Sequence, residues 1–284
     1  MVVGKIKTNN NELWRYSIMS YKDYERKLNE MYDEIYCGGV CSSYEECKSD
    51  CKYSLNFYRA RIGKKYGQNI PKILIVGKES VFPKDYNGEK VSFKVEEPCT
   101  MKDAGYNDHY LRTFYSVAKL LLDDSEMPKS YLKSDMAMEK YEELRHCFAM
   151  TNYYKCVFTD DTKRSDKNTS EEMEKNCAEI LLKEIEILKP DIVILQGKNH
   201  VTFWDKLEWE VIGTPQSTNI QCEKGTRSYN QGLYCAKLNE HKFYLIDSYH
   251  PTSHGIWANE KVFCAFNDIL QKARSEYANE KASL

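Results

Sequence analysis

Three short apolar segments of the sequence each end in residues that are capable of chemistry. Gly77 ends the segment ILIVG and is followed closely by Glu79, Asn152 ends the apolar part of HCFAMTNYY, and His250-Pro251 follows YLIDSY. A carboxylate, a carboxamide and an imidazole can together hydrogen-bond the edge of a planar heterocycle and stabilise a charged leaving group. No Ser or Cys lies on a glycine-flanked turn, so the sequence does not predict a nucleophile–base triad.

Helical patterns separate these apolar segments along the chain. Residues 107–123 and 170–190 have amphipathic spacing, with Asn107 and Ser170 as N-caps, and Glu184 interrupts the apolar face of the second helix. Apolar strands that alternate with helices indicate a parallel sheet covered on both faces. Such sheets bind ligands at the carboxyl ends of their strands, so we expect the polar residues to meet at one edge. The other predicted elements are helices at 21–36 and 255–273 and strands at 71–77, 146–154, 191–197 and 242–248.

The composition limits the class of protein. The chain has 284 residues, 42% of them hydrophobic and 30% charged, and no apolar run of about 18 residues that could span a membrane. The first residues lack the pattern of a secretory signal, so we expect a cytoplasmic protein. The net charge of -2 argues against a broadly basic nucleic-acid binder. We expect a monomer with one α/β domain at 56–284 and a helical extension with a cysteine cluster, 1–55, packed on it.

The order of several short motifs resembles the uracil-DNA glycosylase superfamily. These motifs are ILIVG, DYNG, TNYYKC, a cysteine-containing helix that leads into LKPDIVILQG, and YHP. The resemblance covers roughly residues 45–275 and is closest to the iron–sulfur branch often called family 4. It implies a three-layer α/β/α fold with a central, mainly parallel four-stranded sheet. It also implies a monofunctional DNA glycosylase, which flips a pyrimidine nucleotide out of DNA and hydrolyses its N-glycosidic bond to leave an abasic site.

The first family motif diverges in this sequence. Gly77 is retained, but the Pro-Gly of the family is missing and Glu79 lies one place later than the acid of family 4. The resemblance implies that Glu79 positions water and opposes the positive charge that develops on the deoxyribose. The alternative is a solvated or helix-capping glutamate.

The remaining site residues follow from the later motifs. Phe93, shortly after Asp-x-x-Gly, corresponds to the ring that stacks on the extruded base; the alternatives are a core phenylalanine, or Cys99 at this position. Asn152 corresponds to the carboxamide that binds the pyrimidine edge, or else it satisfies backbone groups. His250 would donate a hydrogen bond to the base, with Pro251 fixing the turn. His254 is a candidate phosphate contact.

Eleven cysteines in a reducing compartment make a metal or cluster site worth seeking. The resemblance implies a [4Fe–4S] cluster held by Cys156, Cys177 and two closely spaced N-terminal cysteines. Two CxxxC pairs qualify, Cys37/Cys41 and Cys47/Cys51, and the distance to the first strand favours Cys47 and Cys51. The alternatives are a four-cysteine structural zinc site, because thiolates bind zinc as well as iron–sulfur clusters, and a ligand set drawn wholly from residues 37–51.

A short basic segment before the first strand is the candidate contact with the DNA backbone, although such runs are also common on solvated surfaces. Its cations are Arg59, Arg61, Lys64 and Lys65.

Two further functions remain open. The divergent first motif could enlarge the pocket, so the substrate would be a hypermodified phage base, such as glucosylated hydroxymethylcytosine, removed in antiviral defence. A catalytically inactive protein of the same fold that binds DNA or a nucleotide is the other alternative. An unrelated α/β nucleotide-binding enzyme ranks last, since the sequence has no GxGxxG or Walker loop.

Overall fold

The structure is a computed structural model that describes residues 19–36, 41–47, 59–68, 70–77, 95–155, 171–197, 201–222, 225–250 and 257–283. Its helices are α1 (Tyr21–Ile35), α2 (Tyr44–Cys47), α3 (Asp108–Leu121), α4 (Lys133–Met136), α5 (Glu139–Glu142), the 3-10 helix η2 (Glu143–Cys147), α6 (Glu171–Leu188), α7 (Val201–Trp204) and α9 (Glu260–Ala282). Its strands are β1 (Arg61–Ile62), β2 (Ile73–Gly77), β3 (Phe148–Asn152), β4 (Ile192–Gln196), β5 (Glu208–Val211), β6 (Gln216–Cys222), β7 (Gly225–Leu238) and β8 (His241–Ser248).

Four parallel strands form the centre of one mixed sheet. The strand order is β1-β3-β2-β4-β8-β7-β5, with β6 paired to β7. Strands β3, β2, β4 and β8 are parallel, whereas β1, β7 and β5 join them in antiparallel pairs. The four predicted strands are therefore confirmed as the parallel core, and the sheet is larger than the four strands that we expected.

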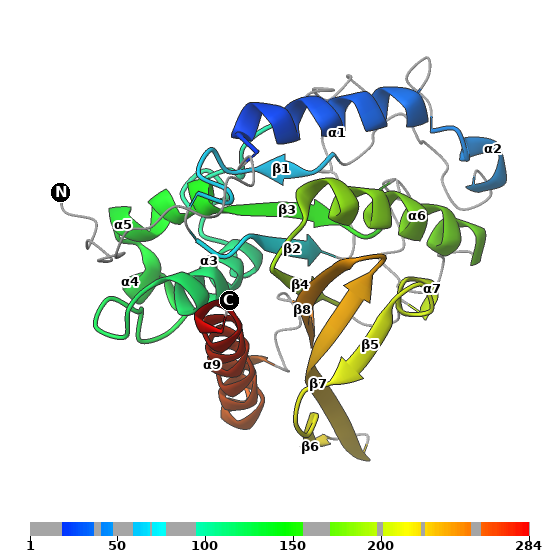
Figure 1. The fold of residues 1–284 in the computed structure, drawn as a ribbon. Coiled ribbons are helices and arrows are strands. Elements are labelled where there is room, and N and C mark those ends of the chain that lie inside the picture. The colour runs from blue at the N-terminus through cyan, green and yellow to red at the C-terminus, as the bar shows by residue number, and fades with distance from the viewer. Residues whose placement is uncertain are drawn as a thin grey trace.

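Helices cover both faces of this sheet, which confirms the three-layer α/β/α architecture. Every residue of β2, β3 and β4 is buried, as strands between two helical layers must be. One hydrophobic cluster joins a face of the sheet to α1 and α6, and a second joins the other face to α3 and α9. Figure 1 shows these two helical layers on opposite sides of the strands.

Local sequence signals explain where several helices begin and end. Ser20 and Asp23 form a capping box at the start of α1. The side chain of Asn107 accepts a hydrogen bond from the Tyr110 amide at 3.1 Å, so the predicted cap of α3 is confirmed. The predicted cap of α6, Ser170, lies outside the described residues. Helix α6 ends where Lys189 adopts a φ of 46°, just before Pro190.

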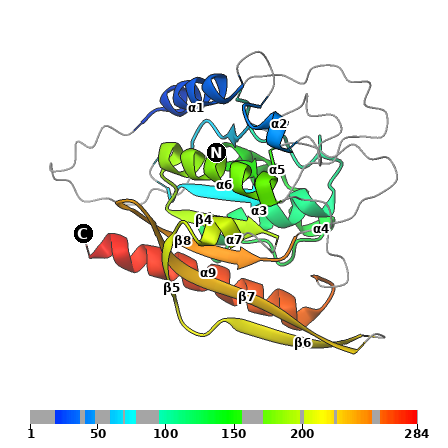
Figure 2. The ribbon, with the colours of Figure 1, turned by 90° about the vertical axis from the view of Figure 1, so that its right-hand side faces the viewer.

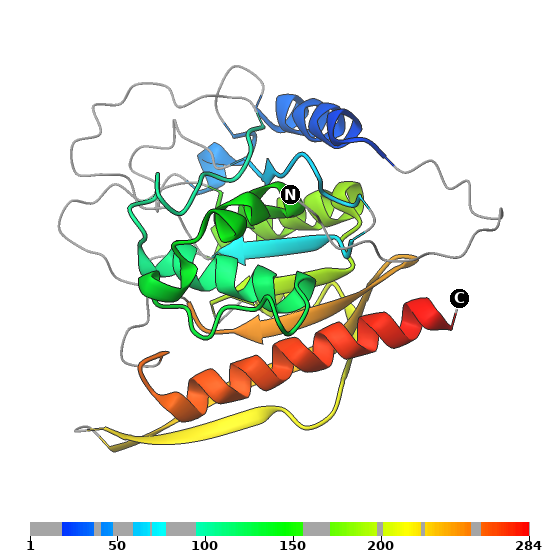
Figure 3. The same ribbon diagram turned by 90° about the vertical axis from the view of Figure 1, so that its left-hand side faces the viewer.

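The part of the sheet formed by β5, β6 and β7 was not predicted. Strand β7 is 14 residues long: its second half pairs with β8 and β5, and its first half forms a hairpin with β6. Figures 2 and 3 show that this hairpin extends beyond the rest of the sheet. Among the described residues, no helix is both long enough and apolar enough to cross a membrane.

Candidate active site

The carboxyl ends of the four parallel strands lie level with one another. Gly77 is paired in register with Asn152 on one side and with Gln196 on the other, and Gln196 is paired with Ser248. Neighbouring strands are about 4.8 Å apart, so Asn152 and Ser248 lie about 14 Å apart along this edge. The predicted arrangement of strand-end residues at one edge is therefore present for Gly77, Asn152 and the segment that leads to His250.

Gly77 makes room for the carboxamide of Asn152. A Cβ atom built on Gly77 would lie 2.5 Å from Asn152 Oδ1, closer than side-chain contacts allow. The Tyr153 amide also donates to the Gly77 carbonyl at 2.7 Å, which holds the end of β3 against β2. Asn152 is buried. The lack of a side chain at Gly77 thus sets where this carboxamide lies.

The backbone around His250 is held by its neighbours. The indole Nε1 of Trp257 donates to the His250 carbonyl at 2.8 Å. Two residues earlier, Ser248 Oγ donates to the Leu195 carbonyl at 2.8 Å, and the Gly197 amide donates to the Ser248 carbonyl at 3.0 Å. These bonds tie the start of the His-Pro segment to the end of β4 and to Trp257, which precedes α9.

A second imidazole, which the sequence did not point out, lies against His250. The rings of His109 and His250 are stacked, with centroids 5.8 Å apart and planes 22° apart. Burial, reinforced by the nearby His250, lowers the pKa of His109 to about 4. Its Nδ1 is shielded from water and has no hydrogen-bond partner among the described residues. His109 is therefore neutral at pH 7, and it lies in the first turn of α3, where the helix dipole also disfavours a cation.

Arg112, one turn further along α3, is a buried cation close to this imidazole pair. Its Nη2 donates to Asp108 Oδ2 at 3.3 Å, while its Nε and Nη1 have no hydrogen-bond partner in the described part of the chain. The guanidinium lies 4.7 Å from the centre of the Tyr131 ring and 5.6 Å from that of Trp257. Aromatic faces attract a guanidinium, and this attraction partly replaces the missing hydrogen bonds. Arg112 thereby connects α3 to the residue that anchors His250.

The loop after Asn152 is fixed by a buried ion pair. Lys155 Nζ lies 2.6 Å from Glu184 Oε2, 2.7 Å from Glu184 Oε1 and 2.6 Å from Thr151 Oγ1. The Tyr32 hydroxyl donates to Glu184 Oε1 at 2.5 Å and accepts the Ala60 amide at 2.7 Å. Burial lowers the pKa of Lys155, and the adjacent carboxylate opposes that shift. Glu184, which interrupted the apolar face of its helix in the sequence, is thus the buried partner of Lys155.

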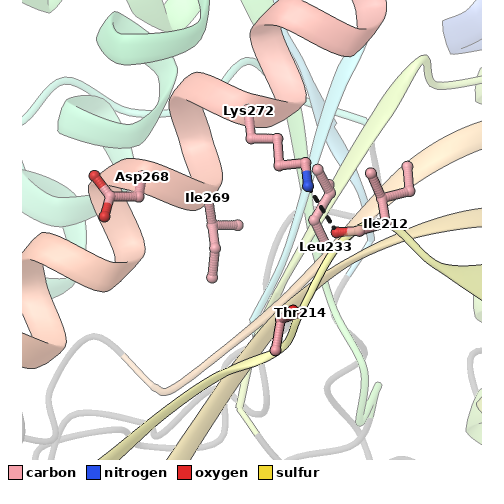
Figure 4. Close-up of a pocket in the computed structure, with 6 residues that line it drawn as sticks. All are labelled: Ile212, Thr214, Leu233, Asp268, Ile269 and Lys272. Atoms are coloured by element: carbon pink, nitrogen blue, oxygen red, sulfur yellow. Dashed lines mark hydrogen bonds between the residues drawn. The ribbon is translucent and has the colours of Figure 1, made fainter.

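A small cavity on the α9 face of the sheet is separate from these residues. It has a volume of about 230 Å³, smaller than the roughly 300 to 1,000 Å³ of typical ligand pockets. Lys272 closes one side by donating to the Ile212 carbonyl at 3.2 Å, as Figure 4 shows. None of the predicted site residues that the structure describes lines it. The cavity is lined by Ile212, Thr214, Leu233, Asp268, Ile269 and Lys272.

The sequence matches a known protein family over most of its length. A family model described as "Uracil DNA glycosylase superfamily" matches residues 65–274. The chain belongs to the uracil DNA glycosylase superfamily. Members of this superfamily are glycosylases that act on DNA. A search of curated proteins finds no match.

Several residues that the superfamily motifs predict lie outside the described residues. They are Glu79, Phe93, Pro251 and His254. Their roles remain predictions, and the described part of the site consists of Gly77, Asn152 and His250, with His109 added. The sequence does contain a histidine in the first turn of the predicted helix at 107–123. That position alone is a weak indication that His109 belongs to the site, because only the tertiary structure brings it against His250.

The predicted DNA-backbone cations are spread over different parts of the molecule. Arg59 is mostly buried and bonds Asn29 and Asp33 on α1. Lys64 forms an ion pair with Glu97, and the Lys65 amide donates to a carbonyl just before β3 begins. Both lysines therefore lie at the amino end of β3, opposite Asn152. The fourth cation, Arg61, is paired with Met150 in the β1–β3 ladder. The structure does not gather these cations at the candidate site, and their contact with DNA remains a prediction.

Three buried cysteines lie where the N-terminal segment packs on α6, two of them in that segment and one on the helix. Burial, with smaller contributions from the nearby Cys47 and Cys41, raises the pKa of Cys177 to about 12. The Lys155 amide donates to Cys177 Sγ at 3.4 Å, and Asn176 Nδ2 lies 3.6 Å from Cys47 Sγ. Cys51 and Cys156 lie outside the described residues. Within the described part of the chain, no three His, Cys, Asp or Glu side chains are grouped closely enough to hold a metal ion.

Proposed function

We propose that this protein is a monofunctional DNA glycosylase, which hydrolyses the N-glycosidic bond of a flipped-out pyrimidine and leaves an abasic site. One observation carries the proposal. The carboxamide of Asn152, held against Gly77, lies at the same sheet edge as His250 in a chain of the uracil DNA glycosylase superfamily.

The two described polar groups suit the two ends of a pyrimidine. A carboxamide offers a donor and an acceptor, as the O4 and N3–H edge of uracil requires. The imidazole of His250 donates one N–H to the base oxygen O2, where negative charge develops as the bond breaks. The ring of His109 is stacked on that of His250. In this proposal Glu79 positions the attacking water and Phe93 stacks on the base.

The environment of Lys155 supports the monofunctional part of the proposal. A glycosylase that also cleaves the strand needs an amine that attacks the sugar. Lys155, three residues after Asn152, is fully buried, and its amine is bonded to Thr151 and Glu184. It is therefore unavailable as a nucleophile. Intact abasic DNA, without strand cleavage, is the expected product.

Base release measures this activity directly. Purified protein is incubated with oligonucleotides that carry one uracil and with phage DNA that carries hypermodified pyrimidines, and released bases are identified by mass spectrometry. Release of uracil supports the ordinary substrate. Release only of a pyrimidine with a bulky 5-substituent supports an enlarged pocket, as the missing Pro-Gly suggests. Binding without release from any DNA would favour the inactive binding protein.

Matched variants test the assignment of the site. Asn152→Ala and His250→Asn should each lower the single-turnover rate about 100-fold, the usual effect of removing one hydrogen bond to a developing charge. The control is His241→Asn at the other end of β8, where the imidazole contacts the Pro190 carbonyl at 2.8 Å. The rate of His241→Asn should stay within about twofold of the wild-type rate, because the substitution lies far from the strand ends that form the candidate site. Equal losses in all three variants would contradict the assignment.

We further propose that Cys47, Cys51, Cys156 and Cys177 hold a [4Fe–4S] cluster, with structural zinc as the alternative. Cys47 and Cys177 are close to each other and buried, and Cys156 directly follows Lys155, whose amide contacts Cys177. Thiolates are soft ligands suited to either group. Cys41 is also near Cys177, so it competes with Cys51 as the fourth ligand. The bound group would stabilise the fold around α2 and α6, because base hydrolysis requires no electron transfer.

Metal analysis separates these alternatives. Iron, sulfide and visible absorption in anaerobically purified protein would support the cluster, whereas zinc without visible absorption would support the alternative. Cys177→Ser should remove the bound metal, and the exposed Cys264 on α9 provides the control variant Cys264→Ser. Comparison of Cys41→Ser with Cys51→Ser then identifies the remaining ligand.

A further inference from the structure

The β6–β7 hairpin is a regular two-stranded ribbon. It has seven paired positions, from Gln216 opposite Gln231 to Cys222 opposite Gly225. At about 3.3 Å per residue, the ribbon is roughly 20 Å long. In this ladder, the backbone groups of each strand that face the other strand are paired with it.

The hairpin extends from the edge of the sheet that carries the candidate active site. The last pair between β7 and β8 is Gly232 with Asp247, so the first half of β7 continues past the carboxyl end of β8. Figures 2 and 3 show the hairpin pointing in the same direction as the arrowhead of β8. Its base is attached to Tyr249, the neighbour of His250. The Asn230 amide donates to the Tyr249 hydroxyl at 2.8 Å, and the Tyr229 and Tyr249 rings are 5.3 Å apart.

The described surface of the hairpin is polar. Four side chains described there are exposed, namely Ser217, Asn219, Ser228 and Asn230. Ser228 Oγ donates across the strands to Asn219 Oδ1 at 2.6 Å. By contrast, the neighbouring strand β5 exposes Trp209 and Val211. A polar ribbon offers an apolar protein surface little to bury, whereas hydroxyls and carboxamides bind phosphates and base edges.

We propose that the β6–β7 hairpin is a DNA-binding arm that enters the major groove of duplex DNA beside the extruded nucleotide. This inference rests on the proposed glycosylase function. The major groove, about 12 Å wide, admits a two-stranded β-ribbon, whereas the minor groove of about 6 Å does not. The base of the arm contacts Tyr249, which directly precedes His250 in the chain, so DNA bound at the active site lies within its reach.

A shortened hairpin tests the arm. Residues 219–228 are replaced by Asn-Gly, which closes a two-residue turn and keeps the three pairs nearest the base of the hairpin. Binding is measured with a labelled 30-base-pair duplex and with one of its single strands. We expect the Kd for the duplex to rise at least tenfold and the Kd for the single strand to change less than twofold. In the wild type, bound protein should protect guanine N7 in the major groove from methylation, and the shortened variant should not.

A second variant, which adds negative charge to the hairpin, tests the same proposal if the shortened chain does not fold. Asn219→Asp with Ser228→Asp places two negative charges on the arm, where they repel phosphates, and should also weaken duplex binding at least tenfold. The control adds the same two charges on α9, at the exposed Gln271→Asp and Ser275→Asp, and should change the Kd less than twofold. If the hairpin variant and the α9 variant change the Kd equally, or if neither changes it, the proposal that the hairpin binds DNA is wrong.

Two other results separate the arm from competing explanations. If the hairpin is instead an interface between two copies of the chain, light scattering will show a dimer that the shortened variant loses, and the inference fails. If the wild-type protein neither binds duplex DNA nor releases a base from it, the proposed function itself fails. If the wild type does both and the shortened variant does so equally well, only the arm is wrong.

Discussion

Two clusters of buried polar side chains in this protein differ in how completely they are hydrogen-bonded. Around Lys155, the amine is bonded to both oxygens of Glu184 and to Thr151, and the carboxylate also accepts the Tyr32 hydroxyl. Around His109, one ring nitrogen and two guanidinium nitrogens of Arg112 have no partner among the residues that the structure describes. The first cluster connects α1, β3 and α6, whereas the second lies at the start of α3 beside His250.

The difference concerns how completely each cluster is hydrogen-bonded among the described residues. A buried charge with complete hydrogen bonding fixes the elements that surround it, and here it fixes the loop that follows Asn152. Native proteins leave few buried polar atoms unpaired, and those that remain unpaired call for a particular explanation. At the start of α3 these unpaired atoms lie beside His250, which our proposal places in the active site.

The largest expected effect comes from breaking the complete cluster. Glu184→Gln leaves the Lys155 ammonium buried without a carboxylate, which should lower the free energy of unfolding by about 3 to 5 kcal/mol. Urea denaturation followed by circular dichroism measures this loss. The double variant Lys155→Met with Glu184→Leu removes both charges and should recover at least half of it.

An exposed ion pair provides the control for that experiment. Arg26 and Glu30 form a pair on α1 at 2.8 Å, with more than half of each side chain exposed. Arg26→Ala should change the free energy of unfolding by less than about 0.5 kcal/mol. A loss below about 1 kcal/mol in Glu184→Gln would mean that the buried pair does not hold the loop as we infer.

An intermediate effect is expected where Gly77 meets Asn152. In Gly77→Ala the new methyl group would lie 2.5 Å from Asn152 Oδ1, so the carboxamide must move away from its place at the site. The single-turnover rate of base release should fall about 100-fold, comparable with losing the hydrogen bond altogether.

Gly105→Ala serves as the comparison for this variant. Gly105 has a φ of 66°, and no described atom lies within 4 Å of the methyl carbon that alanine would add, so alanine there strains the backbone without touching the site. Its stability should fall by about 1 kcal/mol while its rate stays close to that of the wild type. A normal rate in Gly77→Ala would contradict the role of Asn152.

The smallest expected effect is the pH dependence that His109 contributes. Its pKa is about 4 in the folded protein and about 6.5 in the unfolded chain, so the unfolded chain binds more protons between these values. The stabilisation is complete above pH 6.5 and is lost as the pH falls towards 4. Between pH 6.5 and about pH 5 we expect a loss of about 1 to 2 kcal/mol, since each pKa unit corresponds to about 1.4 kcal/mol.

His109→Gln should remove that contribution. The groups facing His109 are His250, Tyr110 and, on the same turn, Asp108, and all three are retained in the variant. Thermal unfolding between pH 4 and pH 7 is compared for the variant and the wild type. Identical pH profiles would show that the imidazole stack has no influence on stability.

Hydrophobic patterning predicted the parallel core well and the outer strands poorly. The all-buried segments ending at Gly77 and Asn152 were recognisable because strands between two helical layers are continuously apolar. Strand β5 is exposed throughout, and Gly232 interrupts β7 where it passes from one partner to the other. Their pairing depends on contacts across the sheet that leave no periodic signal in the sequence.

For the candidate site too, some residues could be predicted from the sequence and others could not. The sequence alone determined which polar residues end the apolar strands, because parallel strands of similar length bring their carboxyl ends to one edge. Asn152 and His250 could be named on that basis. Only the tertiary structure decided that His109 stacks on His250, that Glu184 is buried against Lys155, and that the β6–β7 hairpin extends beside the site. These contacts join residues far apart in the chain, and packing selects them after the local patterns have formed.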